Sequence, residues 1–130
     1  MVKNTIFKVL FISWMMFVTF FSLFSLSGVG TSRFNIPHMD KAVHFTFYSV
    51  MVVLGYLAMR SKTVQQAKRS KLLWYIVLFA VTYGIIIEVL QHVLTTDRHG
   101  DPLDALANSI GAFVGMFVIR FLFFRTPSLK

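Results

Sequence analysis

The stretch LLWYIVLFAVTYGIIIEVLQHVL, residues 72–94, decides the fold class of this chain. It is long enough to cross the ~30 Å hydrocarbon core of a bilayer, which takes about 20 helical residues. The links to the neighbouring apolar stretches are short, so consecutive helices should pack antiparallel. We predict an all-α membrane protein, a single transmembrane domain over residues 1–130 with four transmembrane helices in an antiparallel bundle with short loops. The other three predicted spans are residues 9–29, 41–59 and 103–124.

The composition also favours a bilayer over water. The 130 residues are 56% hydrophobic and 16% aromatic, and a soluble globule of this size could not keep so much apolar surface from water. There are no cysteines, which excludes a disulfide framework and a thiolate metal site. A net charge of +8 would suit nucleic acid, but the basic residues stand at the ends of the apolar stretches, where they set membrane topology. We expect membrane lipids as partners and no nucleic acid.

The first apolar stretch has a second interpretation. Lys3 and Lys8, followed by an apolar run and small residues up to Gly28, resemble a signal peptide. The run is longer than a usual signal core and no clean Ala-x-Ala site follows it. We therefore expect a retained helix, which N-terminal sequencing of the inserted protein would test.

The basic residues predict the orientation. If both ends are cytoplasmic, only Arg33, Lys41 and Arg98 lie outside, and the other ten of the 13 Lys and Arg residues lie inside. This is a positive-inside distribution. The N- and C-termini are therefore predicted in the cytoplasm, and the acidic residues gather on the other side of the membrane. Those acidic residues are Asp40, Glu88, Asp97, Asp101 and Asp104.

The start of the second span carries the first group of candidate site residues. Asp40, His44 and Tyr48 are spaced i, i+4, i+8 and share one helix face. A carboxylate one turn above an imidazole can fix the tautomer of the imidazole. In the alternative, Asp40 only caps the helix and His44 bonds to a neighbour.

The third span holds an acidic residue about six positions from its outer end, roughly 9 Å deep at 1.5 Å per residue. This residue, Glu88, can reach Gln91 and His92, which lie three and four positions later. A carboxylate at that depth needs a proton, a cation or water, and is read by default as functional. His44, Lys41 and Arg98 are its candidate partners. The alternative is a polar lock that holds the helices together.

The last polar gap leads into the fourth span. Asp101, Pro102 and Asp104 match a helix start, with a cap, a proline and an acid in the first turn. Asp104 and Asn108 share one face that points inward. Arg98 is either a surface pair of little energy or a fork for phosphate or carboxylate.

Small residues follow on the fourth span. Gly111 and Gly115 form a small-xxx-small surface that, with Ala107, makes a groove for another helix. Packing within the chain is the expectation. A homo-oligomer is an alternative that nothing else in the sequence supports.

These groups together resemble the VanZ-like family of bacterial membrane proteins. The resemblance implies a small polytopic helical protein of the bacterial cytoplasmic membrane and cell envelope. The family takes its name from a protein linked to resistance to the glycopeptide teicoplanin, and the resemblance implies no particular reaction. The matching pieces are Asp40-Lys41-x-x-His44-Phe45-x-x-Tyr48, Glu88-x-x-Gln91 and Arg98-x-x-Asp101-x-x-Asp104-x-x-x-Asn108-x-x-Gly111-x-x-x-Gly115.

Three functions stay open. The first is binding or handling of an envelope lipid, precursor or glycopeptide-related ligand, with Lys41 and Arg98 holding an anion. The second is a membrane-embedded hydrolase or transferase acting on a lipid headgroup, with His44, Glu88 and Asp104 as catalytic candidates. The third is a structural or regulatory subunit. The predicted ligand-binding residues are Asp40, Lys41, His44, Tyr48, Glu88, Gln91, Arg98, Asp101, Asp104 and Asn108.

No cofactor is expected, and the site prediction contains no metal. His44, Glu88, Asp101 and Asp104 nevertheless offer oxygen ligands and one imidazole, a set that suits Mg²⁺ or Mn²⁺. A metal site therefore remains an alternative.

Overall fold

The structure, a computed structural model, describes residues 2–24, 38–60, 66–96 and 100–124. All regular structure in these ranges is helical, and each of the four helices is long and apolar enough to cross a membrane. The predicted all-α, four-helix membrane fold is therefore confirmed. The helices are α1 (Val2–Leu23), α2 (Met39–Met59), α3 (Gln66–Leu94) and α4 (Pro102–Phe123).

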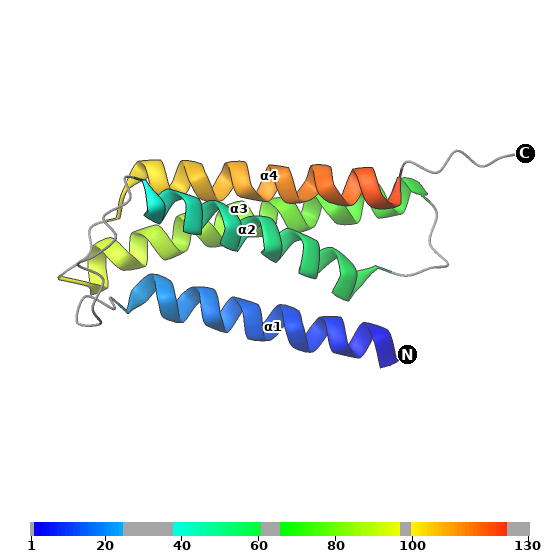
Figure 1. Ribbon diagram of the computed structural model, residues 1–130, viewed down its shortest axis with the longest axis horizontal. Coiled ribbons are helices and arrows are strands. Elements are labelled where there is room, and N and C mark those ends of the chain that lie inside the picture. Colours follow the sequence, from blue (N-terminus) through cyan, green and yellow to red (C-terminus); the bar gives the residue numbers. More distant parts are fainter. Residues whose placement is uncertain (1, 25–37, 61–65, 97–99, 125–130) are drawn as a thin grey trace, which may run out of the picture.

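The four helices form an up-and-down bundle. α1 and α3 begin at the end of the bundle where α2 and α4 finish (Figure 1). α2 and α4 make the most extensive contact, and α1 packs on α2 and α3. The start of α2, the end of α3 and the start of α4 therefore meet at one end of the bundle.

The helix bounds differ from the apolar limits read in the sequence. α1 begins at Val2 and ends at Leu23, and residues 25–29 of its predicted span lie outside the described residues. α3 begins at Gln66, so that Lys68 and Lys71 belong to the helix. Lysine has a good helix propensity, and a helix does not need to end where its apolar stretch does.

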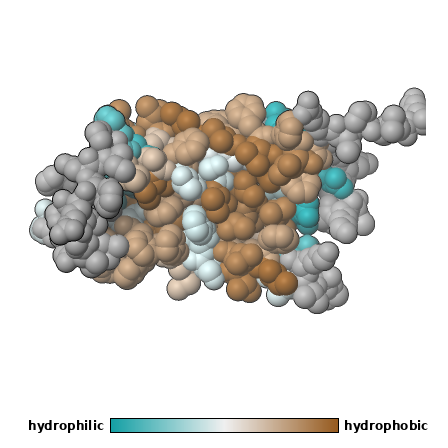
Figure 2. Space-filling model, viewed as in Figure 1, coloured by the Kyte–Doolittle hydropathy of each residue, from teal (hydrophilic) through white to brown (hydrophobic). Residues whose placement is uncertain are grey.

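Apolar side chains cover the outside of the bundle as well as filling it. On the face drawn in Figure 2, hydrophobic residues cover much of the middle, with residues of intermediate hydropathy among them, and hydrophilic ones lie toward the two ends. Leu78 and Phe117 are 63% and 62% exposed, while Tyr48 and Met51 are completely buried. This exposed apolar belt is what a bilayer would cover.

Two glycines allow the close contact between α2 and α4. A Cβ at Gly111 would overlap the carbonyl oxygen of Phe45, and a Cβ at Gly115 would lie 2.6 Å from the carbonyl oxygen of Ser49. A side chain at either position would push the two helices apart. The small-residue surface thus faces a helix of the same chain.

Candidate functional site

A buried polar cluster lies where three helices meet at one end of the bundle. It consists of His44 on α2, Glu88 on α3, and Asp104 and Asn108 on α4. These four residues are between 1% and 8% exposed. Burying so many polar groups together is costly unless they bond to one another or to a ligand.

Hydrogen bonds within this cluster define the state of the imidazole. The Nδ2 amide of Asn108 donates to Glu88 Oε1 at 3.3 Å. The Oδ1 atom of Asn108 is therefore its acceptor atom, and it lies 3.1 Å from His44 Nδ1. His44 Nδ1 must donate this bond, which leaves Nε2 as the nitrogen that carries the lone pair in a neutral ring.

The remaining nitrogen and oxygen atoms of the cluster have fewer hydrogen-bond partners. His44 Nε2 faces Asp104 Oδ2 at 4.0 Å, too far for a direct hydrogen bond. Glu88 Oε1 lies 3.5 Å from His44 Nδ1, but Glu88 Oε2 is buried without a hydrogen-bond partner among the described residues. The imidazole therefore lies between two carboxylates with unused acceptor capacity.

Lys41 closes the cluster toward the end of the bundle. Its Nζ atom lies 3.0 Å from Asp101, 3.1 Å from Asp104 Oδ1 and 3.3 Å from Asp40. Asp104 thus gives one oxygen to the lysine and turns the other toward His44. Lys41 therefore pairs with Asp40, Asp101 and Asp104 rather than with Glu88.

Asp101 starts α4 as the sequence predicts. Its side chain accepts a hydrogen bond of 2.8 Å from the backbone N–H of Leu103, and Pro102 is the first helical residue. This backbone hydrogen bond, followed by the bond from Lys41, lowers the pKa of the Asp101 carboxyl below its usual value. The cap also fixes the entry angle of α4 and with it the position of Asp104.

Neither of the two alternative roles of Asp40 matches the structure. The N-cap of α2 is His38, so Asp40 lies in the first turn instead of capping the helix. Its side chain is 56% exposed and contacts Lys41, whereas the tautomer of His44 depends on Asn108. Asp40 and His44 share a helix face, but α4 packs close enough to supply the nearer partner.

Other predicted site residues lie away from the cluster. Gln91 donates to the backbone oxygen of Ser22 at 2.6 Å and joins α3 to α1. Tyr48 is completely buried one turn below His44, and its hydroxyl has no partner among the described residues. Asp97 and Arg98 lie outside the described residues, so the predicted anion fork at Arg98 is untested.

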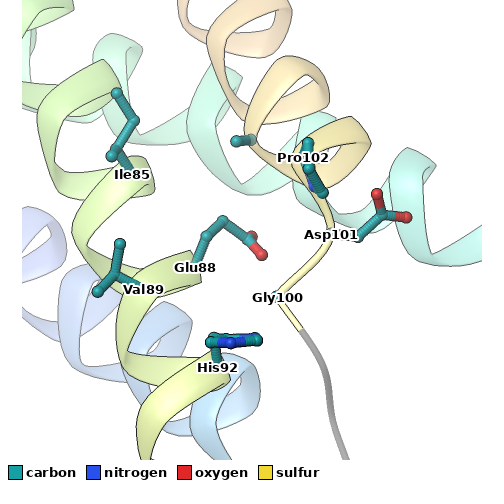
Figure 3. Close-up of a pocket in the computed structure, with 8 residues that line it drawn as sticks. Ile85, Glu88, Val89, His92, Gly100, Asp101 and Pro102 are labelled. Carbon is teal, nitrogen blue, oxygen red and sulfur yellow. The ribbon is translucent and has the colours of Figure 1, made fainter.

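A cavity of about 300 Å³ between α3 and α4 reaches the cluster from one side. Glu88 and His92 extend from α3 toward Gly100 and Asp101 at the start of α4 (Figure 3). Most of the exposed lining is apolar, including Ile85, Val89 and Ala105, and the first two are about half exposed on the outside of the bundle. We call this space the α3–α4 cavity.

A second cavity of about 200 Å³ lies between α1 and α2. Phe21, Phe47 and Val43 contribute to its lining together with His44 and Asp40. The cluster is therefore bordered by two mostly apolar spaces, one lined by Glu88 and the other by His44.

Two glycines that shape the site are not among the residues predicted from the sequence. A Cβ at Gly84 would come within 3.1 Å of Asn108 and Tyr48, and a Cβ at Gly100 would come within 2.5 Å of the Glu88 carbonyl oxygen. Gly84 stands four residues before Glu88, on the same helix face. That spacing was the available signal that a partner helix approaches there.

The cluster also contains a group of potential metal ligands. One atom each from His44, Glu88 and Asp104 can be chosen so that all lie within 4.8 Å of one another. The chemistry available to this site is therefore proton handling, hydrogen bonding to a polar group or coordination of a cation.

Comparison with known protein families gives a match over nearly the whole chain. Residues 3–124 match the protein-family model described as VanZ/LLP1. No curated protein and no solved structure matches the chain.

Proposed function

The chain belongs to the VanZ/LLP1 family of membrane proteins, and from this premise we propose that it binds an amphiphilic component of the bacterial cell envelope. The ligand would be a lipid or a lipid-linked precursor. Its polar headgroup would reach the buried polar cluster, and its apolar chain would lie along the bundle. The single observation that supports this most is the α3–α4 cavity, which runs from lipid-facing side chains to Glu88.

The lining of this cavity matches an amphiphile better than a water-soluble ligand. Ile85 and Val89 form its outer part and are 51% and 55% exposed, on the surface that a bilayer would cover. Glu88 forms its inner part, with one carboxylate oxygen that no described residue satisfies. A ligand that donates a hydrogen bond at one end and is apolar at the other would satisfy both parts.

The charge balance limits how the headgroup is held. Among the described residues here, four carboxylates accompany a single lysine, Lys41, which already contacts three of them. An anionic headgroup would therefore need positive charge from elsewhere. Its sources would be Arg33 or Arg98, which both lie outside the described residues, or a bound cation.

We further propose that the protein lies in the bacterial cytoplasmic membrane with both termini in the cytoplasm. The cluster would then face the extracytoplasmic side, where envelope precursors are assembled into the wall. Lys68, Arg69, Lys71 and Arg120 support this orientation, because they lie at the opposite end of the bundle. A reporter fused after Lys130 should give a cytoplasmic signal, and a periplasmic signal would contradict the proposed topology.

Native mass spectrometry of the protein extracted from its own membrane tests the binding function. The informative variant is Ala105→Phe, which fills the α3–α4 cavity. Its matched control is Leu106→Phe, the same new side chain on the neighbouring, lipid-facing position. A specific lipid or precursor adduct should be present in the wild type and in Leu106→Phe and lost in Ala105→Phe. Equal adducts on all three folded proteins would refute binding in this cavity.

A membrane-embedded acid–base enzyme is the second candidate. The specific observation is that His44 lies between Glu88 and Asp104, so one ring nitrogen faces each carboxylate. A hydrolase or transferase could use such a group to move a proton to or from a lipid headgroup. Incubation of the wild type and of His44→Gln with an extracted envelope lipid pool tests this case. If the protein is an enzyme, the wild type should convert a lipid into a new species and His44→Gln should not.

A structural or regulatory role for the cluster makes a different prediction. If the polar residues only lock the helices, Glu88→Gln and His44→Ala should unfold the bundle or prevent its insertion. Variants that melt like the wild type but lose the lipid adduct would exclude the lock.

A further inference from the structure

We infer that His44, Glu88 and Asp104 form a binding site for one divalent transition-metal cation such as Mn²⁺ or Zn²⁺. The site would use one imidazole nitrogen and two carboxylate oxygens, contributed by α2, α3 and α4. It goes beyond lipid binding, because the cation needs no lipid to bind.

The spacing of the ligand atoms carries the inference. Metal–nitrogen and metal–oxygen bonds of this class are about 2.0–2.2 Å long, so two ligands of one ion lie up to about 4.3 Å apart. His44 Nε2 and Asp104 Oδ2 are 4.0 Å apart, which is too far for a hydrogen bond and suits an ion between them. One atom of each of the three residues lies within 4.8 Å of the others, so the set would have to contract by about 0.5 Å to hold a single ion.

The imidazole is already oriented for coordination. Its Nδ1–H donates to Asn108 Oδ1, which leaves the Nε2 lone pair directed toward Asp104. A histidine ligand of a metal commonly donates its other ring N–H to a neighbouring oxygen, and this bond holds the ring and raises its basicity. Asn108 is itself held by its bond to Glu88 Oε1, so it is a positioning residue for both ligands.

The carboxylates supply an independent observation. Glu88 is 7% exposed, yet its Oε2 atom has no hydrogen-bond partner among the described residues. Asp104 is 8% exposed and has one oxygen on Lys41 and the other turned toward His44. A divalent cation bound between the two carboxylates would offset their negative charge, which burial makes costly.

The sequence alone also allowed Mg²⁺, but Asp101 does not belong to the three-residue set, and the donor set without it favours a transition metal. An imidazole with two carboxylates suits Zn²⁺ or Mn²⁺, whereas Mg²⁺ prefers oxygen ligands alone. Three protein ligands also leave coordination positions for water or a ligand oxygen. The α3–α4 cavity leads to Glu88, so a phosphate or carboxylate headgroup could coordinate the ion from there, which would reconcile an anionic ligand with this acidic end.

The test uses the full chain in detergent, purified without a polyhistidine tag, stripped with chelator and titrated with Mn²⁺. Electron paramagnetic resonance of free Mn²⁺ gives the binding curve, and pulsed measurements detect a nitrogen coupled to the bound ion. We expect one saturable Mn²⁺ per chain with an imidazole nitrogen coupling. We expect binding weakened at least about tenfold in His44→Gln and Glu88→Gln, since loss of even an outer-shell partner costs about 10–100-fold.

The matched control is His38→Gln, the same change at an exposed histidine near the same end of the bundle. It should bind like the wild type. No saturable Mn²⁺ binding, or binding without nitrogen coupling, would overturn the inference. So would equal weakening in His38→Gln and His44→Gln, which would indicate adventitious surface binding. Should His44→Gln fail to fold, the near-isosteric Glu88→Gln and the wild-type nitrogen coupling still decide the outcome.

Discussion

The substitution Gly115→Ala tests the close α2–α4 contact on which the polar cluster depends. The new Cβ would lie 2.6 Å from the Ser49 carbonyl oxygen, compared with an ordinary contact of 3.4 Å or more. The helices would have to separate by about 0.8 Å, because a backbone atom cannot rotate aside as a side chain can. Overpacking of this kind costs about 1–3 kcal/mol, and the better helix propensity of alanine returns up to about 1 kcal/mol. We expect a net loss of about 1–2 kcal/mol in the free energy of unfolding.

The control for this experiment is Gly55→Ala, the same change on α2. Its Cβ would meet only side-chain atoms of Ile76 and Phe11, both at 3.1 Å. These side chains can shift by a few tenths of an ångström, so the unfolding free energy should stay within about 0.5 kcal/mol of the wild type. Detergent-induced unfolding in mixed micelles, followed by circular dichroism, measures both. Equal effects of the two substitutions would refute the argument that backbone contact at Gly115 sets the helix spacing.

Three further predictions concern the polar end of the bundle. Lys41→Met should lower the unfolding midpoint, because it leaves three carboxylates without their counter-charge, and adding Asp104→Asn should restore part of the loss in a double-mutant cycle. Glu88→Gln keeps an acceptor for the amide of Asn108 and should change the unfolding free energy by less than about 1 kcal/mol. Glu88→Ala leaves that amide without its acceptor and should cost about 1–3 kcal/mol. The same unfolding titration measures both. The pKa of the Asp101 carboxyl is lower in the folded protein than its ordinary value of 3.8, so the ionised carboxylate stabilises the fold above pH 3.8. This contribution should be lost as the pH falls from 3.8 through the lower folded pKa. Between pH 7 and pH 3 the melting temperature should therefore fall less for Asp101→Asn, which keeps the cap, than for the wild type. An equal fall in both proteins would contradict this.

The contrast between Asp101 and Asp40 shows how far local patterns reach. Asp101 caps α4, as its position before Pro102 predicts, because capping depends on a few neighbouring residues. The same type of argument fails for Asp40, which lies inside the first turn of α2. The N-cap of α2 is His38, two residues earlier than a cap at Asp40 would place it.

The spacing of residues along a helix predicts which side chains share a face. It does not predict which neighbouring helix that face contacts. The i, i+4 pattern correctly placed Asp40, His44 and Tyr48 on one side of α2, yet His44 bonds to Asn108 of α4. Gln91 lies three residues after Glu88, but it bonds to the backbone of Ser22 on α1. These partners depend on the rotation of each helix about its axis, which a short link does not determine.

The sequence by itself determined the fold class, the number of helices and the end of the bundle where the acidic residues gather. Length and hydropathy suffice for these properties, because a membrane span must be apolar and must satisfy its backbone internally. Only the tertiary structure decided that Lys41 serves Asp101 and Asp104, and that His44 lies between Glu88 and Asp104. The physical reason is that charged and polar groups pair over a few ångströms, and those distances exist only once α2, α3 and α4 have packed together.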